Sequence, residues 1–167
     1  MGNRKLNKYG VKVLVGTFLG PFMQVGLLFI SAGRMDIAQG WAYLVVSFIG
    51  MFGGIMFVCK ANPELLNHRG QWEKKKDTKP WDKFMLIAFG IMGFYILPVV
   101  IGLDIRFQWS YLGYRYTIAG IVLFLVGSVI INWAMIVNTH FETSVRIQND
   151  RGHKVITTGP YKIVRHA

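Results

Sequence analysis

Long stretches without a charged side chain alternate with short basic segments along this chain. Four of these stretches lack Asp, Glu, Lys and Arg for 20 or more residues, at 13–32, 37–59, 84–103 and 116–139. None shows the polar stripe of a helix packed on a soluble core, and each could cross about 30 Å of hydrocarbon as a helix. The pattern therefore predicts an all-α fold, a polytopic membrane helical bundle with four transmembrane helices in one integral membrane domain.

Composition and charge agree with a membrane location. Hydrophobic residues make up 53% of the chain and the mean hydropathy is +0.38, which is too apolar for an ordinary soluble domain. Four Lys and Arg precede the first stretch, seven lie in the second loop and five follow the fourth stretch, whereas the first and third loops hold one and two. This distribution predicts that both termini are cytoplasmic. Topology and anionic headgroups then explain the net charge of +11, and we expect no nucleic-acid partner.

The second loop, at 60–83, is predicted to be cytosolic and to contain a short helix. Pro63 suits the first turn of a helix, and Asn62 before it is a typical N-cap. Leu65 and Leu66 are expected to face lipid from this interfacial helix. The lysines and tryptophans that follow indicate an anchor to lipid headgroups.

Small and polar residues within the apolar stretches carry further expectations. Glycines in the first two stretches indicate close helix packing, at Gly16, Gly20, Gly26, Gly50, Gly53 and Gly54. Pro98 predicts a kink in the third stretch because proline lacks a backbone N–H. Asn132 in the fourth stretch would either bond to a neighbouring helix or face a polar cavity. The single cysteine, Cys59, excludes a disulfide or a multi-cysteine metal site within the chain.

A cytosolic segment at 140–167 follows the fourth stretch and holds most of the candidate chemistry. Residues 145–148 and 154–157 are predicted to be extended and to form a small hairpin. A Gly-Pro pair then restarts a helix on which Tyr161 and Arg165 share one face. The backbone N–H groups at the start of that helix could hold an anionic group such as a carboxylate. From spacing alone, simple contact between these basic residues and headgroups is an equally good interpretation.

The run NWAMIVNTHFETSVRIQNDRGHKVITTGPYKIVRHA resembles the core of the isoprenylcysteine carboxyl methyltransferase family. Members of that family are integral membrane enzymes that use S-adenosyl-L-methionine. NPELLNHR and KPWDK resemble the loop before the third span in the prokaryotic branch, so the resemblance covers this loop and the last third of the chain. Phospholipid methyltransferases and some sterol reductases share a related GPYxxxRHP segment.

The resemblance implies a membrane methyltransferase that binds S-adenosyl-L-methionine in the cytosolic segment. Its acceptor would be a lipidic or prenylated small molecule, with the carboxylate of an isoprenylcysteine-like compound as the methylated group. The implied cofactor-binding residues are Gln148, His153, Lys154, Val155, Ile156, Tyr161, Arg165 and His166. Arg165 would hold the pocket together through charge-assisted bonds. The resemblance assigns no metal ligand and no catalytic residue, and a carboxylate acceptor needs no general base.

The chain also departs from the family. Ala167 stands where the family has the proline of its RHP motif. The family continues through further membrane helices to an acidic segment and an arginine that complete the cofactor and substrate contacts, so the sequence is expected to be C-terminally incomplete. The alternatives that stay open are a phospholipid N-methyltransferase, an inactive membrane protein with a structural or interaction role, and a reductase related to the sterol enzymes.

Overall fold

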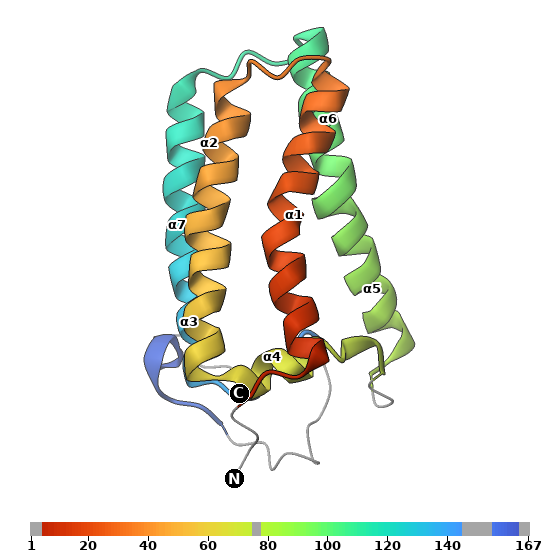
Figure 1. Cartoon of the computed structure of the whole chain (residues 1–167). Helices are drawn as coiled ribbons and strands as arrows, with labels where there is room; N and C mark the ends of the chain where they lie inside the picture. Colours follow the sequence, from red (N-terminus) through yellow and green to blue (C-terminus); the bar gives the residue numbers. More distant parts are fainter. Residues whose placement is uncertain (1–4, 75–77, 145–154, 164–167) are drawn as a thin grey trace.

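The computed structural model describes residues 5–74, 78–144 and 155–163 (Figure 1). Four of its helices are apolar and long enough to cross a membrane, at Lys8–Ala32, Ala38–Ala61, Pro80–Phe107 and Tyr114–Val137. Within the described residues there is no strand. These observations confirm the predicted all-α membrane bundle and its four spans. The first and third helices extend beyond their uncharged stretches, because charged side chains near a helix end can reach the interface.

Two of the four spans are single helices, and two contain a π-helical turn. The single helices are α1 (Lys8–Ala32) and α7 (Tyr114–Val137). The second span consists of α2 (Ala38–Ser47), η1 (Phe48–Gly53) and α3 (Gly54–Ala61). The third consists of α5 (Pro80–Ile91), η3 (Met92–Ile96) and α6 (Leu97–Phe107). Short elements outside the spans are α4 (Pro63–Arg69), η2 (Trp72–Lys74) and η5 (Gly159–Lys162).

The spans pack in the spatial order α7, α2–α3, α1 and α5–α6. Figure 1 shows α4 lying across the end of the bundle where α1 begins and where α3 and α7 end. The short elements η2 and η5 lie near the same end. This end therefore gathers the second loop, the start of α1 and the described part of the C-terminal segment.

The irregularity predicted at Pro98 lies one turn earlier in the helix. An N–H at position 98 would have bonded to the carbonyl of Phe94, and that carbonyl lies inside the π-helical turn η3. Widening the turn before a proline is a common way to relieve the missing bond and the clash of the ring. The second π-helical turn, η1, was not predicted.

Glycines let the second and fourth spans approach each other closely. A Cβ at Gly50 would lie 2.8 Å from Ser128 Oγ, and one at Gly54 would collide with the amide of Asn132. Asn132 Nδ2 donates to the carbonyl of Gly50 at 3.3 Å and to that of Ser128 at 2.7 Å. Asn132 therefore bonds to a neighbouring helix, one of the two expected alternatives. By contrast, a Cβ at Gly26 would meet nothing within 4 Å.

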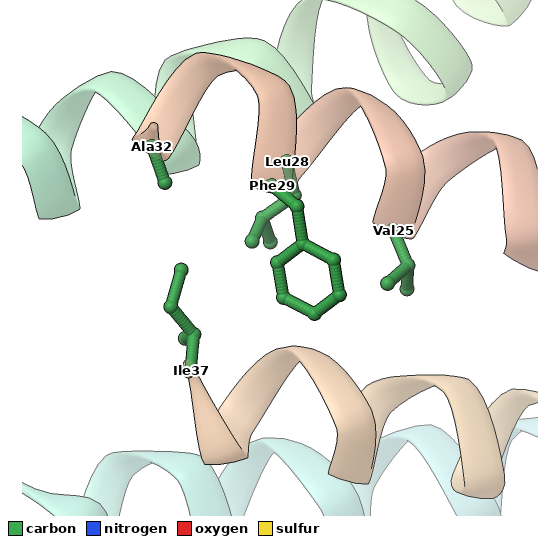
Figure 2. Close-up of a cluster of buried hydrophobic side chains, with 5 residues drawn as sticks. All are labelled: Val25, Leu28, Phe29, Ala32 and Ile37. Atoms are coloured by element: carbon green, nitrogen blue, oxygen red, sulfur yellow. The ribbon is translucent and has the colours of Figure 1, made fainter. Parts of the chain in front are cut away.

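One buried apolar cluster joins the first two spans at the end remote from α4. Figure 2 shows four α1 side chains on the side of the helix that faces α2, and Ile37 at the start of α2 pointing back toward α1; the cluster comprises Val25, Leu28, Phe29, Ala32 and Ile37. The turn between the helices begins at Gly33, whose φ of 72° favours glycine. The turn and the cluster together make the first two spans an antiparallel helical hairpin.

A second cluster lies at the α4 end and corrects an expectation about α4. It comprises Ile55, Val58, Leu65, Leu66 and Met135. Leu65 and Leu66 are 0% exposed, so the prediction that they face lipid was wrong. They pack instead with residues of α3 and α7. The expected N-cap is confirmed, since Asn62 Oδ1 accepts from the Leu65 N–H at 3.3 Å.

Replacing Gly54 with valine should lower the free energy of unfolding by about 1–3 kcal/mol. The valine side chain would have to displace the Asn132 amide from between α3 and α7. The matched control is Gly26→Val, which makes the same change in a helix where the new side chain meets open space. Thermal unfolding in detergent, followed by circular dichroism, measures both variants. Equal destabilisation of the two would contradict the packing role of Gly54.

Candidate functional site

The end of α7 is fixed by the amide of Asn62. Its Nδ2 donates to the carbonyl of Met135 at 3.1 Å, while its Oδ1 caps α4. The last carbonyls of a helix have no partner within that helix, so this bond satisfies one of them. Asn62 is only 6% exposed, and both ends of its amide are used. The position of the segment that follows α7 is thereby tied to the second loop.

The first residues after α7 are held by further contacts with that loop. Arg69 Nη1 donates to the carbonyl of Phe141 at 2.9 Å, and its guanidinium carbon lies 5.6 Å from the centre of the Phe141 ring. Burial lowers the pKa of Arg69, and the negative charge of Glu142 opposes this shift. Arginine nevertheless keeps its charge at neutral pH. Thr78 Oγ1 also bonds to Ser144 Oγ at 3.3 Å, and both side chains are buried.

The GPY motif folds back onto the end of α7. Gly159 has a φ of 61°, and a Cβ there would lie 3.0 Å from the side chain of Val137 and 3.2 Å from the indole nitrogen of Trp133. Glycine is therefore favoured both by its backbone conformation and by the close approach. Pro160 starts the 3-10 helix η5, and Asn138 Nδ2 donates to Tyr161 Oη at 2.9 Å. Each residue of the motif thus has a separate local role.

An apolar groove of about 310 Å³ runs along α7 to Tyr161. Its lining residues are Gly127, Ile130, Ile131, Ala134, Phe141, Pro160 and Tyr161. Ile130 and Ile131 are 50% and 48% exposed, so the groove is continuous with the apolar surface of α7. At its other end lies Tyr161, whose hydroxyl accepts a bond from Asn138. The groove therefore joins a membrane-type surface to a polar group.

The structure describes three of the eight residues assigned to the cofactor pocket. Val155 is 66% exposed, while Ile156 and Tyr161 are half-buried, and only Tyr161 is bonded to α7. The other five lie outside the described residues: Gln148, His153, Lys154, Arg165 and His166. The assignment of the pocket as a whole therefore stays a prediction.

The predicted local structure of this segment needs two corrections. Residues 155–157 form no strand, and the rest of the expected hairpin lies outside the described residues. The Gly-Pro pair starts a four-residue 3-10 helix that ends at Lys162, in place of the expected longer helix. The physical reason is the hydrogen bond from Asn138 to Tyr161, which holds η5 against α7. Residues 155–157 then form an irregular segment that leads into η5.

Sequence reasoning missed two residues that shape this site. Neither Asn138 nor Arg69 was assigned a role from the sequence. The position of Asn138 in the sequence, directly after the apolar residues of α7, could have indicated its role. An amide at the end of a helix can bond to a segment that folds back onto that helix. Arg69 offered no such local signal, because its partner is 72 residues away in the sequence.

Comparisons with models of protein families, with curated proteins and with solved structures found no match to this chain. Within the described residues, no group of three or more His, Cys, Asp or Glu side chains is placed to hold a metal ion. The site is therefore characterised by its own geometry: a tyrosine held by a hydrogen bond from Asn138 at the end of an apolar groove.

Gly159→Ala should release η5 from α7, since alanine is strained at a φ of 61° and its Cβ would crowd Val137 and Trp133. A cost of about 1–2 kcal/mol is expected for the left-handed conformation. Hydrogen exchange measures the effect at the amides of Tyr161 and Ile163, which bond to Thr158 and Pro160 and should exchange roughly tenfold faster.

The control for this variant is Gly120→Ala in α7, where a Cβ meets nothing within 4 Å. Exchange at Tyr161 and Ile163 should stay unchanged in the control. If Gly159→Ala also leaves it unchanged, the packing of η5 against α7 does not depend on this glycine.

Proposed function

We propose that this chain forms part of a membrane methyltransferase that transfers a methyl group from S-adenosyl-L-methionine to a lipidic acceptor. The acceptor group proposed is the carboxylate of an isoprenylcysteine-like molecule. The spacing of RGH, GPY and RH in the sequence supports the chemistry. The single structural observation that supports it best is the bond between Asn138 and Tyr161, which holds the GPY motif at the end of an apolar groove.

A reaction between a water-soluble donor and a lipidic acceptor needs a place where both can be held. The groove along α7 offers apolar walls continuous with the exposed apolar surface of that helix, and the tyrosine at its end carries a hydroxyl. Holding two reactants in line lowers the barrier by removing the entropy cost of their encounter. Shielding a carboxylate from water would also raise its reactivity, because a hydrated anion is a weaker nucleophile.

The described residues fit one part of S-adenosyl-L-methionine, its adenosine. The half-buried ring of Tyr161 and the aliphatic side chain of Ile156 suit contact with a purine or ribose. Because Asn138 donates to the Tyr161 oxygen, the hydroxyl hydrogen remains available for a bond to the cofactor. When bound, the cofactor would supply an electrophilic methyl group. The residues proposed to contact its charged groups are His153, Lys154, Arg165 and His166.

The proposed orientation places both termini in the cytoplasm, where S-adenosyl-L-methionine is available. The Lys and Arg distribution supports this orientation, with the basic segments before α1, in the second loop and after α7. In the structure α4 and η5 lie at the end of the bundle where α1 begins. The proposed cofactor segment and the basic loop would thus share the cytoplasmic side.

Tyr161→Phe should weaken binding of S-adenosyl-L-methionine by about 3- to 10-fold, the usual effect of losing one hydrogen bond. Isothermal titration calorimetry on the full chain in detergent measures it, with His153→Ala as a second site variant. Tyr116→Phe is the matched control, because this tyrosine lies at the opposite end of α7 and is 66% exposed. Wild-type affinity in both Tyr161→Phe and His153→Ala would remove the site assignment.

Methyl transfer itself is tested with radiolabelled donor and two acceptors, a prenylcysteine and a phosphatidylethanolamine analogue. Product from the prenylcysteine alone is the expected outcome. If only the phosphatidylethanolamine analogue is methylated, the acceptor group is a phospholipid amine and not the proposed carboxylate. If the chain binds S-adenosyl-L-methionine but forms neither product, it is a cofactor-binding protein and not a methyltransferase for these acceptors. If it does not bind S-adenosyl-L-methionine, the methyltransferase proposal is contradicted.

A further inference from the structure

The backbone at the start of α1 is fastened to α4. Asn67 Oδ1 accepts from the N–H of Asn7 at 2.9 Å, and its Nδ2 donates to the carbonyl of Lys5 at 3.1 Å. Asn67 is only 6% exposed. Gly70, directly after α4, lies so close to the Tyr9 backbone that a Cβ would collide with the Tyr9 carbonyl. The position of Tyr9 relative to the second loop is therefore set by buried contacts.

Two ammonium groups converge on the ring of Tyr9. Lys74 Nζ donates to Tyr9 Oη at 2.8 Å and lies 5.1 Å from the ring centre. Lys8 Nζ lies 5.3 Å from the same centre. Both distances are within the range of cation–π attraction. The hydrogen bond to Tyr9 raises the pKa of Lys74, so this group stays protonated at neutral pH.

The acidic residue recorded beside this cluster is Glu73. Glu73 Oε1 lies 3.4 Å from Lys12 Nζ, and its charge also acts on Lys74. Glu73 thus acts on Lys12 and Lys74, whereas the contact recorded for the Lys8 ammonium group is with the Tyr9 ring. Because Lys8 Nζ and Lys74 Nζ lie 5.3 Å and 5.1 Å from the same ring centre, their like charges repel each other. An anion that bridges Lys8 and Lys74 would offset the repulsion and add charge-assisted hydrogen bonds.

The depth of the cluster indicates which anion is available. Lys8 is the first residue of α1, and the uncharged stretch of this span begins at residue 13, little more than one turn later. The ammonium groups therefore lie at the level of lipid headgroups, where Lys and Tyr side chains are typical. We infer that Lys8, Tyr9 and Lys74 form a binding site for the phosphate of an anionic phospholipid headgroup. This site is separate from the groove at Tyr161 and does not depend on the proposed methyl transfer.

The test measures lipid preference by native mass spectrometry of the full chain, released from micelles that contain phosphatidylglycerol and phosphatidylcholine. The wild-type protein should retain phosphatidylglycerol preferentially. The double variant Lys8→Gln/Lys74→Gln should lose about tenfold of that preference, as expected for two basic residues near anionic lipid. Tyr9→Phe keeps the ring and both charges but removes the bond to Lys74, and should lose about two- to threefold.

The matched control is Lys60→Gln/Lys83→Gln, which removes the same charge from the end of α3 and the first turn of α5. An equal loss in both double variants would overturn the site, because only overall charge would then matter. A second arm adds sodium phosphate to phosphatidylcholine micelles and follows thermal unfolding. Stabilisation equal to that by phosphatidylglycerol would overturn the assignment to a lipid, and no stabilisation by phosphate supports it.

Discussion

The amide of Asn62 is the interaction on which the rest of this structure depends. The chain leaves α3 here, and a backbone that turns near the membrane must still satisfy its N–H and C=O groups. One side chain does so for two elements, by accepting from the N–H of Leu65 in α4 and donating to the carbonyl of Met135 in α7. As a result α4 lies across the end of the bundle, and its two leucines are buried in a cluster with residues of α1, α3 and α7.

Because α4 is fixed in this way, it organises both neighbouring segments. Asn67, near its C-terminal end, holds the backbone before α1 and thereby sets the position of Tyr9. Arg69, at its last position, holds the carbonyl of Phe141 and thereby sets the start of the segment after α7. The candidate headgroup site and the candidate cofactor segment thus share one seven-residue scaffold. A change that shifts α4 should affect both.

The spans, the cap at Asn62 and the irregularity near Pro98 could be predicted because each follows from a local rule. Span length follows from hydrocarbon thickness, the cap from an amide before Pro63, and the irregularity from a missing N–H. The burial of Leu65 and Leu66 could not be predicted, since lipid and protein interior are equally apolar and a leucine suits either. The partners of Arg69 and Tyr161 depend on tertiary packing between segments distant in sequence.

The placement of Tyr161 follows from how α7 is held along its length. Three bonds join the C-terminal half of this helix and its C-cap residue to their surroundings: Asn132 to Gly50, the Met135 carbonyl to Asn62, and Asn138 to Tyr161. These positions follow one another at intervals of three residues, so they lie on neighbouring positions of the helix surface. The remaining surface, including Ile130 and Ile131, stays exposed and apolar. A helix fixed in rotation by polar bonds on one side can present a lipid-facing groove on another, and that groove ends at the tyrosine of the GPY motif.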